Sequence, residues 1–190
     1  KETGPDLVDR RFEACAPNRL HVADITYVRM ANGSFGCTAF ADGVYARRIV
    51  GWACAMTMNT QEPPLQALEQ AISRAASRGG TDGLIHHSDH GTQCTGTVYA
   101  TGVMEYGMLP STGTVGDPYD NAGESADGAY KTELVRRRKP FLDIDDLELA
   151  TFRWVSWWNS KRLHQSLGYR TPEAVETEYH QHQAAQAASL

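Results

Sequence analysis

The chain has 190 residues, of which 41% are hydrophobic and 22% are charged, and its formal net charge is −5. This composition suits one globular domain with a full hydrophobic core, and no apolar run is long enough to span a membrane. The negative total charge does not indicate a nucleic-acid-binding protein, although the basic run at residues 136–139 could hold phosphate locally. The polar N-terminus has no signal-peptide pattern, so we expect a soluble, cytoplasmic protein.

The first half of the chain predicts an arm, an antiparallel sheet and a helix. Residues 1–18 are polar and end in Pro-Asn, which indicates an extended arm or linker. Period-two apolar patterns joined by short turns predict a meander of three strands at 20–28, 35–41 and 47–56. A helix over 60–78 follows, with prolines in its first turn and a glycine pair after its last.

The second half predicts strands and helices that alternate, followed by helices alone. A strand that returns after a helix is a parallel addition to the sheet. The expected strands cover 84–89 and 109–115, and the expected helices cover 97–106, 122–138, 144–162 and a last segment from Thr171 into a frayed tail. The apolar and aromatic residues of the helix over 144–162 are expected to be mostly core: Leu147, Phe152, Trp154, Val155, Trp157 and Trp158. We therefore divide the chain into an arm (1–18), an α/β core (19–140) and a helical extension packed on the core (141–190).

Three acids occupy positions where function is expected. Asp89 ends an apolar strand and is followed by turn residues, and ligand groups collect at the carboxyl ends of strands in open α/β sheets. Asp24 interrupts a mostly apolar strand, so its carboxylate must be hydrogen-bonded, paired or bound to a cation. Glu124 falls in the first turn of a predicted helix. Carboxylates are hard oxygen ligands that suit Mg²⁺ or Mn²⁺.

Cysteines and histidines give weaker signals. The four cysteines are far apart and form no C-x-x-C motif, so reduced thiols are favoured over a structural zinc site. A zinc site made of His86, His87, Asp89 and His90 is an alternative. Adjacent residues of a strand point to opposite faces, however, so His86 and His87 cannot easily share one ion.

The order of elements and a set of motifs together resemble the integrase core of insertion-sequence transposases of the family numbered three, which are relatives of retroviral integrases. The matching stretches run in family order across about 17–180: 17–20, 23–28, 47–52, 86–91, 115–122, 124–125, 131–134, 157–159 and 162–164. The resemblance implies a ribonuclease H-like fold with a mixed five-stranded sheet flanked by helices. It also implies that Asp24, Asp89 and Glu124 are the catalytic acids and the ligands of a two-metal site for Mg²⁺ or Mn²⁺.

The implied reaction is hydrolysis of phosphodiesters at transposon ends, followed by attack of a DNA 3′-hydroxyl on target DNA. The implied partners are DNA and further copies of the chain, with no membrane and with association with the nucleoid during activity. We predict DNA contacts from five residues: Lys131, Arg137, Arg138, His87 and His90.

The sequence also departs from the family pattern. Only 34 residues separate Asp89 from Glu124, one fewer than is usual, and one deleted residue in a helix rotates later side chains by about 100°. If the loop does not absorb this change, Asp120 or Asp127 could compete as the third ligand. Two alternative functions therefore stay open: a catalytically impaired DNA-binding or assembly module from a decayed transposase copy, and a metal-dependent nuclease of the same fold.

Overall fold

The computed structural model describes residues 5–9, 11–56, 62–88, 97–113 and 125–189. Five strands form one sheet in the order β3-β2-β1-β4-β5. Strands β1 (Leu20–Arg29), β2 (Phe35–Gly43) and β3 (Arg48–Ala55) are antiparallel, as the short turns predict. Strands β4 (Ile85–Ser88) and β5 (Leu109–Thr112) add to the edge of β1 in parallel. The predicted mixed five-stranded sheet is confirmed.

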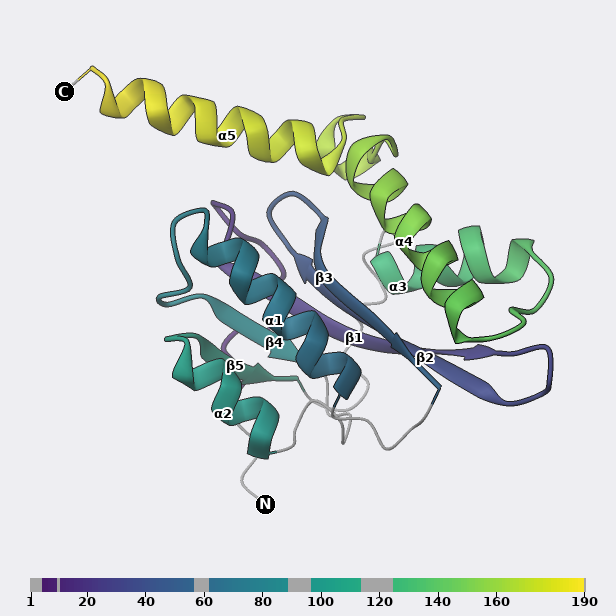
Figure 1. The fold of residues 1–190 in the computed structure, drawn as a ribbon. Coiled ribbons are helices and arrows are strands. Elements are labelled where there is room, and N and C mark those ends of the chain that lie inside the picture. Colours follow the sequence, from purple (N-terminus) through teal and green to yellow (C-terminus); the bar gives the residue numbers. More distant parts are fainter. Residues whose placement is uncertain (1–4, 10, 57–61, 89–96, 114–124, 190) are drawn as a thin grey trace.

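Helices cover both faces of the sheet (Figure 1). On one face, α1 (Glu62–Ala76) and α2 (Thr97–Glu105) enclose a core cluster that includes Leu68, Leu84 and Met108. On the other face, α3 (Ala126–Ala129) and α4 (Ile144–Ser160) enclose a larger cluster built around aromatic residues. Most residues on both faces of β1 and β2 are buried, since helices cover both sides of the sheet.

Helix α1 lies unusually close to β3. An added Cβ at Gly51 would stand 1.9 Å from the carbonyl oxygen of Ala67, so no other residue type fits there without moving the helix. The Gln70 side chain strengthens the same contact, because its amide donates to the carbonyl of Trp52 at 2.8 Å and its oxygen accepts from the Trp52 amide at 3.1 Å. One side chain of α1 therefore makes two hydrogen bonds to the backbone of β3, the edge strand of the sheet.

The predicted helix over 122–138 is irregular in the part that the structure describes. Helix α3 is followed by a π-helical turn (Tyr130–Leu134) and a 3-10 turn (Val135–Arg137). Tyr130 fixes the wide turn, because its ring is fully buried and its hydroxyl lies 2.6 Å from the Thr151 hydroxyl and 3.3 Å from that of Thr38. Periodicity predicts a straight helix here, whereas tertiary anchoring by Tyr130 sets the π turn.

Helix α4 corrects one expectation about the core. Trp154 and Trp158 are buried, but Phe152 and Trp157 are 58% and 43% exposed. The side chains of Leu147, Trp154 and Trp158 are on the buried stripe because they follow the helical period, and Phe152 falls outside that stripe. The expectation that these aromatic residues are mostly core is wrong for these two positions.

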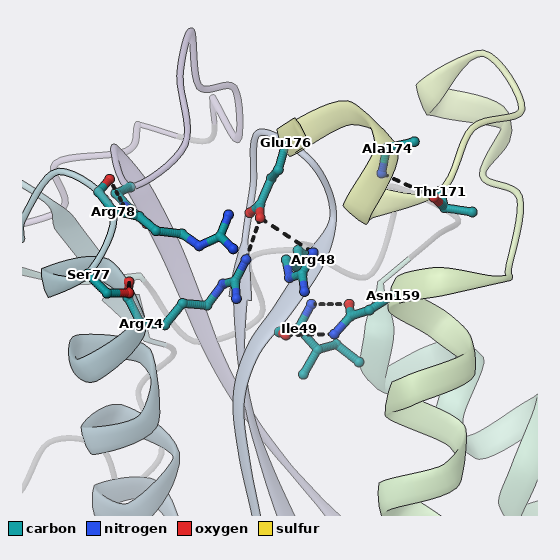
Figure 2. Close-up of polar contacts among 10 residues, drawn as sticks. Arg48, Ile49, Arg74, Ser77, Arg78, Asn159, Thr171, Ala174 and Glu176 are labelled. Atoms are coloured by element: carbon teal, nitrogen blue, oxygen red, sulfur yellow. Dashed lines mark hydrogen bonds and ion pairs between the residues drawn. The ribbon is translucent and has the colours of Figure 1, made fainter. Parts of the chain in front are cut away.

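Helix α5 (Pro172–Ala187) is joined to the core by buried charge (Figure 2). Thr171 caps its first turn and accepts from the Ala174 amide. One turn later, a carboxylate oxygen of Glu176 lies 2.6 Å from Arg74 of α1 and 3.5 Å from Arg48 of β3. The predicted frayed tail is wrong, since the helix continues to Ala187, in keeping with the high helix propensity of its alanines and glutamines.

The N-terminal arm touches the core where it is described. Val8 is buried in a cluster with Leu20, Val22 and Val44, and the Leu7 amide donates to the hydroxyl of Ser111 at 2.9 Å. The division of the chain at residues 18 and 140 stays a prediction. Among the described residues, no helix has both the length and the apolar character needed to cross a membrane.

Candidate active site

The site begins at the junction of β1 and β4. The parallel pairing of these two strands ends with Ala23 opposite Ser88. Asp24 is the next residue of β1, and Asp89 follows Ser88 in the sequence but lies outside the described residues. The Asp24 carboxylate is half-buried, and its Oδ1 accepts from the Ile25 amide at 2.7 Å. This acid therefore stands where β1 ceases to have β4 as a neighbour.

A second acid shares the face of the sheet with Asp24. Phe40 is opposite Asp24 in the antiparallel pair, and Asp42 is opposite Val22. Opposed residues and residues two apart in a strand point to the same face, so Asp24 and Asp42 both face the side covered by α3 and α4. Asp42 is 7% exposed, and within the described part of the chain its Oδ1 has no hydrogen-bond donor.

A third acid comes from α3, which packs against both strands. Asp127 is also buried, and its Oδ1 likewise has no donor among the described residues. Burial raises the pKa of Asp42 well above its usual range, and the negative charges of Asp24 and then Asp127 raise it further, whereas Arg47 lowers it. Asp24 and Asp127 are therefore both close enough to Asp42 for their negative charges to disfavour its ionisation.

Lys131 is the predicted DNA contact nearest to these acids. Its ammonium donates to Asp127 Oδ2 at 2.6 Å, and its side chain is 42% exposed. The helix start that positions Asp127 is fixed by Ser125, whose hydroxyl accepts from the Gly128 amide at 3.2 Å. One cationic side chain thus extends from solvent to the buried carboxylates.

The other predicted DNA contacts have different surroundings. Arg137 is exposed in the 3-10 turn. Arg138 binds both oxygens of Asp146, at 2.9 and 3.2 Å, and its guanidinium lies over the Phe141 ring. A phosphate would have to compete with Asp146 for this arginine. Contacts of Arg137 and Arg138 with DNA stay predictions.

The paired histidines of β4 point to opposite faces, as expected for a strand. His87 is buried, with its Nδ1 3.0 Å from the Ser111 hydroxyl and its ring against Phe12. These internal contacts account for the burial of His87, and its DNA contact stays a prediction. His90, Asp89 and Glu124 lie outside the described residues, so the proposed catalytic set is described only at Asp24.

On the opposite face, His86 Nε2 lies 2.5 Å from the Tyr99 hydroxyl and the His86 ring is near that of His21. Burial is the main cause that lowers the pKa of His21 to about 4, with the charge of Arg74 adding to it, and burial lowers that of His86 to about 3. Both histidines are therefore neutral at physiological pH. Because His86 and His87 are held on opposite faces, their side chains do not converge on one zinc ion.

The donor set suits a hard cation. Asp24 belongs to a group of carboxylates that Lys131 neutralises only in part, and the buried oxygens of Asp42 and Asp127 lack donors within the described ranges. Oxygen-rich, negatively charged surroundings favour Mg²⁺ or Mn²⁺ over thiolate-preferring metals. In the parts of the chain that the structure describes, no three Asp, Glu, His or Cys side chains form a cation site by themselves.

Sequence reasoning missed the role of Asp42. It reads as a turn residue because it precedes Gly43. The signal that could have identified it is the strand pairing, which places it diagonally across from Asp24 once the turn between β1 and β2 fixes the register. Among the described cysteines, Cys15, Cys37 and Cys54 form no disulfide; Cys37 is buried and Cys54 is partly buried, whereas Cys15 is exposed, and Cys94 lies outside the described residues.

Comparison with known proteins shows the family of the chain. Two family models described as integrase core domain match the chain, over residues 14–118 and 106–172. The putative transposase for insertion sequence element IS986/IS6110 of Mycobacterium tuberculosis is 48% identical over 178 residues, covering 92% of this chain and 63% of the relative. The transposase for insertion sequence element IS629 of Shigella sonnei is 42% identical, covering 92% and 57%. The chain therefore spans about three fifths of the length of these relatives.

Solved structures show the same fold. The HTLV-2 integrase catalytic core domain, solved in complex with magnesium, superposes with a TM-score of 0.59 at 16% identity, covering 86% of this chain and 99% of the other. The catalytic core domain of BIV integrase gives a TM-score of 0.52 at 18% identity, covering 88% and 99%. The fold is thus the ribonuclease H-like fold of integrase cores. With a family model that matches more than half of its length, the chain belongs to the integrase core domain family.

Proposed function

We propose that this chain is the catalytic part of a DNA transposase, which cleaves phosphodiesters at transposon ends and transfers the ends to target DNA. The observation that carries the proposal is the register of the sheet. The pairing of β1 with β4 stops one residue before Asp24 on one strand and one residue before Asp89 on the other. Helix α3 begins at Ala126 with Ser125 as its N-cap, so Glu124 precedes the cap in the sequence and is not part of the predicted first turn; we propose that the third acid comes from this position before the helix.

In this proposal, Asp24, Asp89 and Glu124 supply carboxylate oxygens that hold Mg²⁺ or Mn²⁺. Two such ions, when bound, would activate the attacking oxygen and stabilise the leaving oxygen in phosphoryl transfer. The chain's own residues bind and orient the DNA: Lys131 contacts a phosphate beside the acids, and the exposed Arg137 contacts the backbone farther away. Burial and the negative charges of Asp24 and Asp127 raise the pKa of Asp42, which favours its neutral form and so limits the negative charge that the DNA phosphate meets.

We propose that the nucleophiles are a water molecule in the cleavage step and a DNA 3′-hydroxyl in the transfer step. A covalent protein intermediate is not part of this mechanism. The active assembly contains more than one copy of the chain. In support, the HTLV-2 integrase catalytic core domain, which has a similar fold, has been solved in a dimeric and in a trimeric form.

The test is Mn²⁺-dependent cleavage of DNA by the wild type and by Asp24→Asn, Asp89→Asn and Glu124→Gln. Each substitution should abolish cleavage, because each removes an anionic oxygen ligand with little change in shape. Glu148→Gln is the matched control, since it removes an exposed carboxylate on α4 and should leave cleavage unchanged. Equal cleavage by all five proteins would remove the proposal.

Two further readouts separate the alternatives. A nuclease of the same fold would cleave DNA but would not join a 3′ end to a second duplex in a strand-transfer assay. An impaired DNA-binding module would bind DNA without cleaving it. Calorimetric titration with Mn²⁺ then tests the site itself: the wild type should bind the ion, and Asp89→Asn should not.

A further inference from the structure

The ion pair between Asp127 and Lys131 differs from an ordinary pair on a helix surface. An exposed pair at this spacing contributes little to stability, because water solvates both charges. Here the carboxylate side chain is only 8% exposed, whereas the lysine side chain is 42% exposed, and their N–O distance is 2.6 Å. The acid is therefore a fixed, buried partner for a cation that remains accessible from solvent.

The backbone on both sides of this pair is also fixed. Tyr130, which precedes the lysine, is fully buried, with its ring against those of Phe40 and Trp154. Its hydroxyl is hydrogen-bonded to the hydroxyl of Thr151. Lys131 then lies within the π-helical turn, a local widening of the helix that is frequent at functional sites. Because the backbone of Lys131 is set by Tyr130 and its ammonium by Asp127, both ends of this long side chain are held.

The pair lies next to the proposed catalytic carboxylate. The charges of Asp24 and Asp127 both act on Asp42, and α3 packs against the two strands that carry Asp24 and Asp42. A phosphate held near Asp24 would therefore lie near the ammonium of Lys131, which follows α3 in the π-helical turn.

We propose that Asp127 is a positioning residue, which holds the Lys131 ammonium beside the acids so that it contacts the DNA phosphate at the reacting position. The inference rests on the proposed function for its substrate. Asp127 acts only through the lysine and makes no contact with DNA itself. Substitution of Asp127 should therefore affect DNA binding and cleavage only when Lys131 is present.

The first test measures DNA binding without a divalent cation, in EDTA, as a function of salt. A lysine that neutralises one phosphate contributes about 0.9 to the slope of log K against log salt. Lys131→Met should reduce the slope by about this amount in the wild-type background. In the Asp127→Asn background it should reduce the slope clearly less, because the ammonium is no longer held in place. An equal or larger effect in that background would overturn the proposal.

The second test is a double-mutant cycle on Mn²⁺-dependent cleavage. Asp127→Asn should lower kcat about tenfold and change KM for DNA less than about threefold, since misplaced groups chiefly slow the reaction step. In the Lys131→Met background, Asp127→Asn should change neither value further. A similar loss in both backgrounds would show that Asp127 acts independently of the lysine and would overturn the proposal. Glu148→Gln again serves as the matched control.

The two tests also separate this inference from the proposed function. If the wild type binds DNA but does not cleave it, the proposed function fails while the salt-slope cycle still tests the positioning of Lys131. Circular dichroism checks that each variant is folded. Should Asp127→Asn not fold, Asp127→Glu replaces it in both cycles, because it keeps the charge and displaces the ammonium by one methylene, and the same dependence on Lys131 is expected.

Discussion

Acid should unfold this protein through two histidines that its core keeps neutral. His21 and His86 are 1% and 2% exposed, and their pKa values are lowered from 6.5 to about 4 and about 3. A group whose pKa is lowered on folding favours the unfolded state once that state can take up a proton. The stability that comes from keeping each ring neutral is therefore complete above about pH 6.5 and declines as the pH falls towards the folded pKa.

The magnitude follows from these pKa values. Below pH 6.5 each histidine lowers the free energy of unfolding by about 1.4 kcal/mol per pH unit. At pH 5 the loss is about 2 kcal/mol for each, or about 4 kcal/mol for the pair, a large part of the 5–15 kcal/mol that is typical of a domain. Asp42 acts in the opposite direction, because its pKa is raised and its protonation favours the folded state.

Substitution of His21 isolates one of these contributions. Neither ring nitrogen of His21 has a hydrogen-bond partner within the described residues, so His21→Leu removes the titration without breaking a hydrogen bond. Urea unfolding, followed by tryptophan fluorescence between pH 7.5 and 5, should show a smaller acid dependence in the variant. The difference from the wild type should grow to about 2 kcal/mol at pH 5.

The control is His182→Gln, which changes a side chain that is 73% exposed on α5 and should leave the pH dependence as in the wild type. If the wild type and His21→Leu lost stability in parallel below pH 6.5, the buried ring would not be the acid-sensitive group, and this reasoning would be refuted.

Three further predictions concern helix packing and a buried ion pair, and each is tested by measuring the free energy of unfolding in urea. Gly51→Ala should destabilise the protein by about 3 kcal/mol or more, because its Cβ would stand 1.9 Å from a carbonyl oxygen of α1. Gly102→Ala in α2, whose Cβ would stand 3.8 Å from the Leu68 side chain of α1, should instead be neutral or stabilise by up to about 1 kcal/mol. Glu176→Gln should lower the free energy of unfolding by about 3 kcal/mol, since it leaves two partly buried arginines without their carboxylate. A loss below 0.5 kcal/mol, about the level of an exposed ion pair, would contradict the importance of these ion pairs for holding α5 on the core. Phe152→Ser should cost less than about 0.5 kcal/mol because the ring is 58% exposed, whereas Trp154→Ala should cost about 3–5 kcal/mol; similar losses at both positions would contradict the assignment of the buried stripe.

The strands of the sheet could be predicted from the sequence because strand formation depends on patterns between residues close together in the chain. Period-two alternation and short turns predicted the three antiparallel strands, and a glycine pair marked the end of α1. The irregular helix after residue 125 was not predictable in this way. Its π turn depends on Tyr130 reaching Thr38 and Thr151, which are 92 and 21 residues away in the chain, and no local pattern records such contacts.

The candidate site could likewise be predicted only in part from the sequence. The sequence alone predicted the chemical type of the site, because an acid within an apolar strand, such as Asp24, must be hydrogen-bonded, paired or bound to a cation. Only the tertiary structure decided which acids accompany it. Asp42 and Asp127 come from a neighbouring strand and a distant helix, and the register of β2 and the packing of α3 bring their charges together. Propensity and periodicity act between near neighbours in the chain, whereas electrostatic repulsion and burial depend on distances that exist only in the folded state.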